Sequence, residues 1–289
     1  SMNDEVLHSK SNNFLASVYF GKKQIGVSFL DVSTGEFLTA QGNDEYIDKL
    51  LQNFNPSEVL IPKIHKNNFR ETFGEEYHHF YLEDWVYKED YAMETLTNHF
   101  QTATLKGFGI EELSEGIIAS GAILYYLSET QHNKRQHITT IQRIAEDAYV
   151  WMDRFTIRNL ELYHSYNPSA VTLLDVIDKT LSPMGGRLLK RWMALPLKDS
   201  EKIQSRHEVV GYLKDNQEIL KSIQFQIKQI SDLERLISKI AAGKVTPREV
   251  VYLKDSLDAI LPIKSLALES EQKSVKTIGQ QLDSCDVLR

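Results

Sequence analysis

Residues 182–196, SPMGGRLLKRWMALP, form the stretch that decides how the second half of this chain folds. Ser182 has a hydroxyl that can cap a helix, and Pro183 follows at the first helical position, where no backbone N–H is missed. Pro196 ends the run because proline cannot continue the helical hydrogen-bond ladder. Apolar residues recur between them on one helical face: Met184, Leu188, Leu189, Trp192 and Met193. The pattern predicts a short, sharply bounded helix with Trp192 anchored in the core.

Two adjacent glycines inside this predicted helix need their own explanation. Each glycine destabilises a helix interior by about 1 kcal/mol relative to alanine. Gly185 and Gly186 therefore predict that another stretch of backbone approaches the helix closely here. We expect Gly186→Leu to destabilise the second domain by overpacking.

Three sequence blocks of this region follow one another in order: RNLEL at 158–162, LLDVIDKT at 173–180 and PMGGRLLKRWMALPL at 183–197. In order and spacing they resemble the core-domain signature of the MutS family of DNA mismatch-recognition proteins. The resemblance implies structural or inter-domain roles, and no catalytic role, for the signature positions. These are Asn159, Leu160, Glu161, Leu174, Asp175, Asp178, Pro183, Gly185, Gly186, Arg187, Arg191, Trp192 and Pro196.

The first 131 residues alternate between strand and helix patterns. Strands are predicted within 12–40, with a turn at 21–24, and at 58–62; helices are predicted at 46–54, 67–73 and 90–101. Residues 114–131, SEGIIASGAILYYLSETQ, are apolar nearly all round, which is typical of a helix buried between other elements. This order indicates an α/β layered domain with that helix packed across its sheet.

Blocks along this first half also resemble the MutS connector domain: NNFLASVYF at 12–20, DVSTGEF at 31–37, and GFGIEEL at 107–113 followed by GAILYYL. The resemblance implies an RNase H-like fold. We therefore predict an α/β RNase H-like connector domain at residues 1–131. An all-α helical core or lever domain follows at 132–289, and we expect it to be truncated, so that the chain is a piece of a longer protein.

Charge is unevenly distributed along the chain. Residues 1–137 hold 11 Lys and Arg against 20 Asp and Glu (net −9), whereas residues 138–289 hold 22 against 20 (net +2). An acidic half is poorly suited to wrapping DNA by itself. The change in charge supports a domain boundary near 130–140, and the polar run 132–138 is a candidate hinge.

Capping signals mark several helix starts in the second half. Asp199 can cap the helix that follows it, and SDLE at 231–234 and TPRE at 246–249 both have the form of a capping box. The apolar face after the second capping box is predicted to stop at Pro262.

Composition describes a protein of ordinary globular type. The 289 residues are long enough for two domains, with 42% hydrophobic and 25% charged residues. No apolar run approaches the length of a membrane span, so we expect no membrane association. The single cysteine, Cys285, cannot form an internal disulfide, which fits a reducing cytoplasm.

Asp31 is the most tempting catalytic candidate. In RNase H-like nucleases an Asp on an early strand holds a metal ion, but two-metal chemistry needs several converging carboxylates. Glu36 is the one close companion, and it lies beyond a turn. We favour a structural interpretation, in which the Asp31 segment shapes the turn of a hairpin.

Other cofactor and metal signals are weak. Gly243-Lys244 lacks the first glycine and the final Ser or Thr of a phosphate-binding loop, and we expect Gly243 to end a helix. His78 and His79 are adjacent and point apart, and His132 and His137 lie on a polar run without a carboxylate or cysteine between them. We predict no catalytic, cofactor-binding or metal-binding residue.

Arg187, Lys190 and Arg191 form a basic group on the predicted helix that starts at Pro183 and is ended by Pro196. Such a group is most often a solvated or ion-paired face. The functional alternatives are contact with a DNA phosphate or with an inter-domain acid such as Asp175 or Asp178. The resemblance favours the inter-domain ion pair.

The resemblance implies that the whole protein binds mismatched duplex DNA as a homodimer, uses ATP and Mg²⁺, and recruits MutL. For this chain we predict a monomeric, non-catalytic part without ATP or Mg²⁺, which transmits the ATPase and DNA-binding state between domains and contributes a docking surface for MutL. Two alternatives remain: a metal-dependent RNase H-like nuclease using Asp31, and a MutS relative that acts in recombination.

Overall fold

The computed structural model describes residues 9–131, 135–163, 165, 167 and 169–288. This part of the chain divides into two compact units. The sheet unit holds residues 12–131, 135–146 and 151–157. The helical unit holds 9–11, 147–150 and the described residues from 158 onward.

The sheet unit is built on a mixed six-stranded sheet in the order β5-β4-β1-β2-β3-β6. Its strands are β1 (Phe14–Phe20), β2 (Ile25–Asp31), β3 (Glu36–Gly42), β4 (Glu58–Pro62), β5 (His79–Leu82) and β6 (Gln142–Arg143). β1, β2 and β3 are antiparallel neighbours, β4 runs parallel to β1, and β5 and β6 run parallel to β4 and β3. β1 is therefore an inner strand, paired on both sides.

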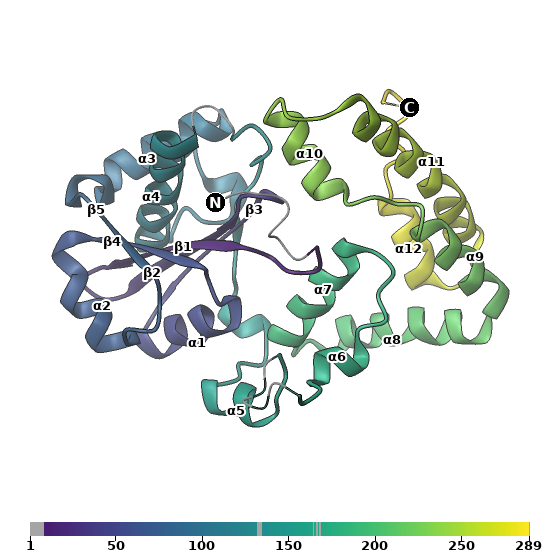
Figure 1. Cartoon of the computed structure of the whole chain (residues 1–289), viewed down its shortest axis with the longest axis horizontal. Coiled ribbons are helices and arrows are strands. Elements are labelled where there is room, and N and C mark those ends of the chain that lie inside the picture. Colours follow the sequence, from purple (N-terminus) through teal and green to yellow (C-terminus); the bar gives the residue numbers. More distant parts are fainter. Residues whose placement is uncertain (1–8, 132–134, 164, 166, 168, 289) are drawn as a thin grey trace. The chain divides into compact units, whose positions relative to one another are not determined.

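Four α-helices surround this sheet (Figure 1). They are α1 (Asp44–Phe54), α2 (Lys66–Phe73), α3 (Glu89–Phe100) and α4 (Ser114–Gln131). Short 3₁₀ turns lie at η1 (Lys63–His65), η2 (Asp84–Tyr87), η3 (Lys106–Phe108) and η4 (Glu146–Ala148). The sequence predicted each α-helix to within two residues, and the predicted α/β layered fold of this half is confirmed.

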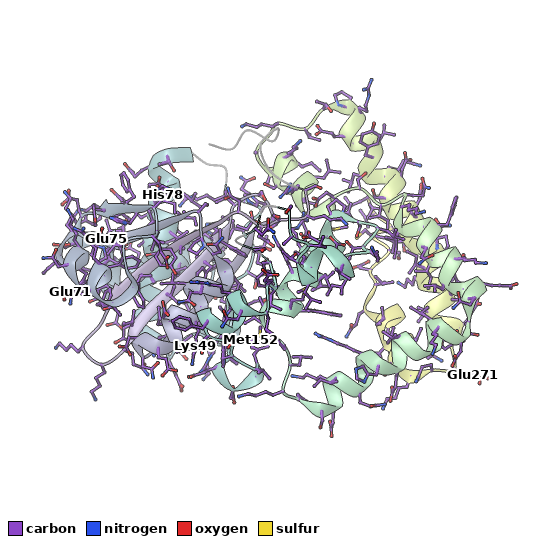
Figure 2. All side chains as sticks on the ribbon, turned by 60° about the horizontal axis from the view of Figure 1, so that its bottom comes forward. Lys49, Glu71, Glu75, His78, Met152 and Glu271 are labelled. Atoms are coloured by element: carbon purple, nitrogen blue, oxygen red, sulfur yellow. The ribbon has the colours of Figure 1, made fainter. Side chains whose placement is uncertain are left out.

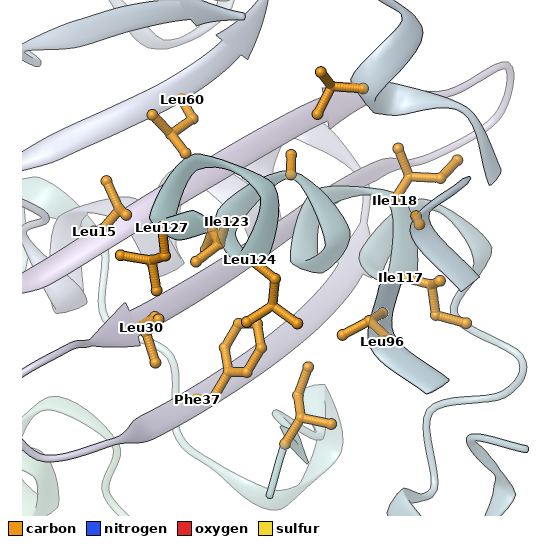
Figure 3. Close-up of a cluster of buried hydrophobic side chains, with 14 of the residues drawn as sticks. Leu15, Leu30, Phe37, Leu60, Leu96, Ile117, Ile118, Ile123, Leu124 and Leu127 are labelled. Atoms are coloured by element: carbon orange, nitrogen blue, oxygen red, sulfur yellow. The ribbon is translucent and has the colours of Figure 1, made fainter. Parts of the chain in front are cut away.

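Helix α4 is the centre of a cluster of buried apolar side chains (Figure 3). It packs on β1, β2 and β3 and on α3, as its apolar sequence predicted. Leu15 and Leu30 face Ile123 and Leu127 in this cluster. The other face of the sheet packs on α1, where aromatic rings meet, with 4.5 Å between the centroids of Phe29 and Phe54.

Gly26 on β2 lets α4 approach the sheet. A Cβ at this position would lie 2.0 Å from the carbonyl oxygen of Glu115 and 2.6 Å from the backbone nitrogen of Gly116. The backbone-to-backbone approach that the sequence suggested for Gly185 and Gly186 therefore occurs at Gly26 instead.

The helical unit has no regular strand among its described residues, so the predicted helical fold of the second half is confirmed apart from β6, which belongs to the sheet unit. Its helices are α6 (Leu173–Ile177), α7 (Pro183–Ala194), α8 (Ser200–Asp215), α9 (Gln217–Ile227), α10 (Leu233–Ala241), α11 (Pro247–Glu269) and α12 (Lys273–Gln281). Helix α5 (Arg154–Asn159) ends just inside this unit.

Most of the predicted caps are present. The Asp199 side chain caps α8, and Thr246 and Glu249 form the capping box of α11. Gly243 has φ +64°, and the Lys244 N–H donates to the Lys239 carbonyl oxygen (2.9 Å), which is the hydrogen bonding of a glycine-ended helix.

Two predictions about helix ends were wrong. The cap of α10 is Asp232, whose side chain accepts from the Arg235 N–H, and not Ser231. The Glu234 carboxylate, expected to complete a capping box, binds Arg187 instead. Pro262 lies inside α11 and does not end it. Proline removes one backbone donor, but packing of α11 against α9, α10 and α12 sustains the helix.

The sheet unit also extends beyond the predicted boundary at 131/132. β6 pairs with β3, and Ile138 and Ile141 are buried in the apolar cluster. Part of the predicted hinge at 132–138 lies outside the described residues. Its described part is packed, because the His137 ring contacts the Val32 carbonyl oxygen (2.8 Å) and Ile138 is buried. The polar sequence gave no sign of this packing.

Within the described residues, no helix combines the length and apolar character needed to cross a membrane.

Candidate functional site

Helix α7 is the element around which the candidate site is built, and its boundaries are those the sequence predicted. The Ser182 hydroxyl accepts from the Gly185 N–H (3.1 Å), and the helix ends at Ala194, two residues before Pro196. Trp192 is not the predicted core anchor, because it is 41% exposed. The guanidinium of Arg206 lies 3.5 Å above its ring, so Trp192 instead makes a cation–π contact.

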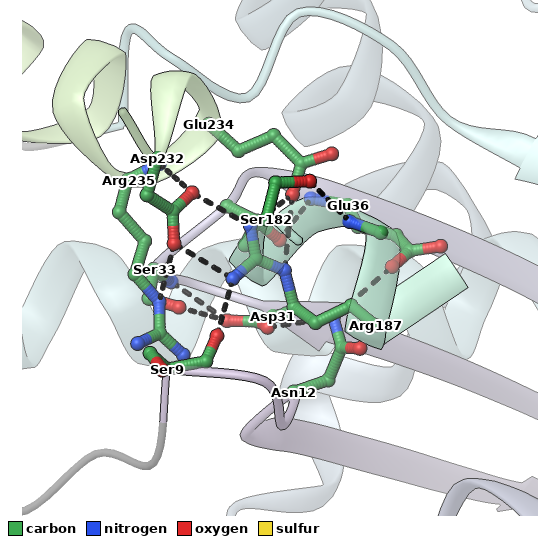
Figure 4. A network of polar contacts seen from close by, with 12 residues as sticks. Ser9, Asn12, Asp31, Ser33, Glu36, Ser182, Arg187, Asp232, Glu234 and Arg235 are labelled. Carbon is green, nitrogen blue, oxygen red and sulfur yellow. Dashed lines mark hydrogen bonds and ion pairs between the residues drawn. The ribbon is translucent and has the colours of Figure 1, made fainter. Parts of the chain in front are cut away.

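Arg187 is the centre of a polar network (Figure 4). Its side chain is 4% exposed. Nη1 and Nη2 donate to the two carboxylate oxygens of Asp232 (2.8 and 2.7 Å), and Nε and Nη2 donate to Oε2 of Glu234 (3.1 and 2.6 Å). Nη1 also donates to the Ser9 carbonyl oxygen (2.7 Å). Every N–H of the guanidinium thus has an acceptor.

The charge state of Arg187 follows from two opposing effects on its pKa. Burial by itself lowers the pKa, because it disfavours the cation. The hydrogen bonds to Asp232 and Glu234, together with their negative charges, outweigh burial and raise the pKa above its usual value. Arg187 is therefore a permanent buried cation that needs both carboxylates.

Lys10 binds the end of the second signature block. Its Nζ donates to Oδ1 and Oδ2 of Asp178 (3.0 and 3.2 Å) and to the Thr180 carbonyl oxygen (3.1 Å). Thr180 also donates its hydroxyl and backbone N–H to Asp178. Hydrogen bonding by Thr180 and the nearby Lys10 ammonium hold the pKa of Asp178 below its usual value, against the opposing effect of burial.

Ser11, like Ser9 and Lys10, makes hydrogen bonds to residues of the helices or signature blocks. Its carbonyl oxygen accepts from Nη2 of Arg235 (2.8 Å), and its hydroxyl accepts from Nζ of Lys190 (3.2 Å). We call residues Ser9, Lys10 and Ser11 the N-terminal anchor. Each of its three residues makes a hydrogen bond to the helical unit.

Gly186 has no side chain and so leaves room for Lys10 of the N-terminal anchor to pack against α7. A Cβ on Gly186 would lie 2.7–2.9 Å from Cγ, Cδ and Cβ of Lys10. A Cβ on Gly185 would meet Ser182 Oγ at 3.1 Å, a looser contact. The predicted close approach is therefore real at Gly186, but the neighbour is a side chain and not a backbone.

The first two signature blocks meet through backbone hydrogen bonds. The N–H groups of Leu173 and Leu174 donate to the carbonyl oxygens of Glu161 and Leu162 (3.0 and 3.1 Å). Asp175 completes the capping box of α6 with Thr172. Of the other signature positions, Asn159 ends α5, Leu160 is exposed, and the Pro196 carbonyl oxygen accepts from the Val150 N–H (2.7 Å).

The acids predicted to pair with Arg187 were not the right ones. Asp175 caps α6 and Asp178 binds Lys10, whereas Asp232 and Glu234 pair with Arg187. These two carboxylates lie at the start of α10, outside the three signature blocks. In the sequence these two residues have the spacing of a capping box, which carries no sign of an ion pair with α7.

The other two basic residues of α7 are partly buried. Burial lowers the pKa of Lys190, and burial lowers that of Arg191 despite the nearby charge of Glu234. Lys190 binds the N-terminal anchor through Ser11. Contact of Arg187, Lys190 and Arg191 with a DNA phosphate stays a prediction.

Asp31 occupies a turn in the sheet unit. Its Oδ1 accepts from the backbone and hydroxyl of Ser33 (2.9 and 2.7 Å), and its Oδ2 accepts from the Asn12 amide (2.8 Å). The same amide donates to Oε2 of Glu36 (3.2 Å). The turn interpretation is confirmed, since hydrogen bonds within the β2–β3 turn and from Asn12 engage both Asp31 oxygens.

Histidines and acids do not converge on a metal site among the described residues. His78 is exposed, as are Glu71 and Glu75, and all three are marked in Figure 2. Nδ1 of His79 lies 2.8 Å from the Tyr77 carbonyl oxygen.

Two stretches of the chain match known protein domains. Residues 13–139 match MutS domain II, and residues 155–287 match MutS domain III. The chain belongs to the MutS family. Within the described residues, the domain II match lies in the sheet unit and the domain III match lies almost entirely in the helical unit.

Curated MutS proteins resemble the chain over its whole length. The chain is 80% identical to the DNA mismatch repair protein MutS of Flavobacterium johnsoniae, 67% to that of Christiangramia forsetii and 53% to that of Parabacteroides distasonis. Each comparison covers 100% of this chain and 33% of the relative. The chain thus spans about a third of the length of these MutS proteins.

Proposed function

We propose that the chain serves as a non-catalytic connector and core part of a DNA mismatch-repair protein, linking the state of one domain to another. In the longer protein, ATP and Mg²⁺ bind outside this part, and a homodimer binds mismatched duplex DNA. The part itself is monomeric, acts in the cytoplasm and offers a docking surface to MutL.

The N-terminal anchor is the observation that carries this proposal. Residues 9–11 are bonded to α7, α10 and Asp178 of the helical unit, and the next residue, Asn12, belongs to the sheet unit. Two residues later begins β1, an inner strand of the sheet. A change in the position of α7 or α10 would therefore act on the sheet through a short, bonded segment. Such an element is what coupling between two sites requires.

Charge supports MutL, and not DNA, as the direct partner of the sheet unit. Residues 1–137 carry a net charge of −9. DNA binding depends on neutralising phosphates with Lys and Arg, and the 11 Lys and Arg of this stretch are outnumbered by 20 Asp and Glu. A protein partner has no such requirement.

The RNase H-like assignment also remains part of the proposal. The antiparallel β1–β2–β3 meander followed by β4 and β5 in parallel supports it. The geometry around Asp31 does not favour the nuclease alternative, because its oxygens are engaged in a turn. The recombination alternative differs in cellular pathway and calls for a genetic test.

A binding titration tests the proposal. The chain is titrated with MutL from the same organism and, in parallel, with a mismatched duplex. We expect MutL binding with little DNA binding. Tight, salt-sensitive DNA binding without MutL binding would reverse the proposed roles and would give the basic residues of α7 a phosphate-binding function. Binding of neither would contradict the docking role.

A further inference from the structure

Five aromatic side chains gather at the outer edge of the apolar cluster of the sheet unit, where two are exposed and three tyrosines pack against the cluster. We call this group the aromatic patch: Phe80 on β5, Trp85 in η2, Tyr91 on α3, and Tyr125 and Tyr126 on α4. Phe80 and Trp85 are 47% and 45% exposed, and the three tyrosines are partly buried. Contiguous exposed apolar groups often mark an interaction site.

The rings of the aromatic patch pack on one another. The Trp85 centroid lies 5.2 Å from those of Tyr91 and Tyr125, in edge-to-face geometry. The Phe80 ring lies 5.5 Å from that of Tyr126, the neighbour of Tyr125 on α4. A rigid set of Trp and Tyr rings loses little entropy on binding, a property of residues that dominate protein interfaces.

Carboxylates surround the aromatic patch. Burial raises the pKa of Tyr125, and the charges of Glu129 and Glu83 raise it further, which places both acids near this ring. Glu58 accepts a hydrogen bond from the Tyr126 hydroxyl (3.4 Å). Residues 83–94 carry five carboxylates and one lysine. Glu83 is paired with Lys63, so part of this charge is compensated.

We propose that the aromatic patch docks a basic segment of a protein partner. Arg or Lys side chains of that segment lie on the faces of the rings and pair with the surrounding carboxylates, since cations are attracted both to aromatic faces and to acids. A second copy that met the first through the same patch would bring like charges together, and a nucleic acid would bring phosphates to carboxylates. The inference goes beyond the proposed function, because it holds for MutL and for any other basic partner.

An octa-arginine peptide is the probe, titrated into the whole chain by calorimetry, with octa-glutamate as the charge control. We expect octa-arginine to bind and Trp85→Ala to weaken it about tenfold. Phe225→Ala, which removes an exposed ring from α9 of the helical unit, should leave affinity unchanged. Glu83→Lys with Glu129→Lys tests the charges without altering the rings, and should also weaken binding about tenfold or more.

Three outcomes would overturn the inference. The first is equal binding of octa-arginine by Trp85→Ala and by the unchanged chain, with circular dichroism showing that both are folded. The second is binding of octa-glutamate, and the third is self-association that Trp85→Ala abolishes. A parallel MutL titration separates this inference from the proposed function. If MutL fails to bind the unchanged chain while octa-arginine shows the expected dependence on Trp85, the docking role for MutL fails and the aromatic patch stands.

Discussion

The sheet unit and the helical unit are stabilised in different ways. Both faces of the sheet are covered by apolar side chains, and residues such as Phe29, Leu50 and Ile123 are fully buried. Among its described residues the helical unit buries fewer and smaller apolar groups: Leu162, Ala194, Leu195, Leu236, Leu257, Ala259, Ala267 and Val275. Its buried residues include the cation Arg187.

This difference has a mechanical consequence. Apolar packing is non-directional and spreads a disturbance over many neighbours. A buried ion pair depends on a few directed bonds, and removing one partner leaves an uncompensated charge. The helical unit therefore holds the N-terminal anchor by a few directed hydrogen bonds and ion pairs, which can be lost together. The sheet that follows the anchor should tolerate the loss of a single contact, because its apolar packing involves many neighbours.

The largest expected effect is that of Arg187→Ala. Loss of the cation leaves Asp232 without its bidentate partner and frees the Ser9 carbonyl oxygen. We expect the free energy of unfolding of the helical unit to fall by about 3 kcal/mol. Urea unfolding followed by far-ultraviolet circular dichroism measures it. Arg206→Ala, which removes an arginine lying on the exposed Trp192, is the matched control and should change stability little. Equal effects of the two substitutions would contradict a special role for Arg187.

Gly26→Ala tests the corresponding close approach in the sheet unit. The new methyl group would lie 2.0 Å from a backbone oxygen of α4, which cannot move alone. We expect a loss of about 2 to 3 kcal/mol in urea unfolding. Gly107→Ala, where a Cβ meets nothing within 4 Å, serves as the control. A Gly26→Ala variant as stable as this control would show that α4 does not pack as described.

Gly186→Leu should destabilise the helical unit less, by about 1 to 2 kcal/mol. The obstructing group is the Lys10 side chain, which can withdraw at the expense of its bonds to Asp178. Gly185→Ala should be neutral or stabilising by up to about 1 kcal/mol, because it improves helix propensity where there is more room. Thermal unfolding of the two variants gives the comparison, and a Gly186→Leu variant that melts like the unchanged chain would exclude close packing by Lys10.

The smallest effect concerns pH and the cap of α11. Hydrogen bonds from Thr246 and the ion pair with Lys239 lower the pKa of Glu249 to about 2. Because the folded pKa lies below the unfolded one, the stabilisation is complete above pH ~4.5 and is lost as pH falls toward 2. Glu249→Gln should therefore be less stable than the unchanged chain at neutral pH. The difference in stability between the two should decrease as the pH falls toward 2. Urea midpoints at a series of pH values measure this, and Glu271→Gln controls for the loss of one charge.

The sequence predicted local structure well and partners poorly. Caps at Ser182, Asp199 and Thr246 and the apolar helix at 114–131 depend on neighbouring residues, so their patterns were readable. The partners of Arg187 come from α10 and from Ser9, far away in sequence, and no local pattern connects them. The continuation of α11 past Pro262 could not be predicted for the same reason, since the packing that sustains α11 is tertiary.

Amide hydrogen exchange of the unchanged chain and of Arg187→Ala tests the central claim most directly, namely that Arg187 holds the segment leading into β1. Arg187→Ala should accelerate exchange at residues 9–13 and at the start of α10, with β2 and β3 unaffected. Unchanged exchange at residues 9–13 would contradict the claim, because the N-terminal anchor would then be held without Arg187.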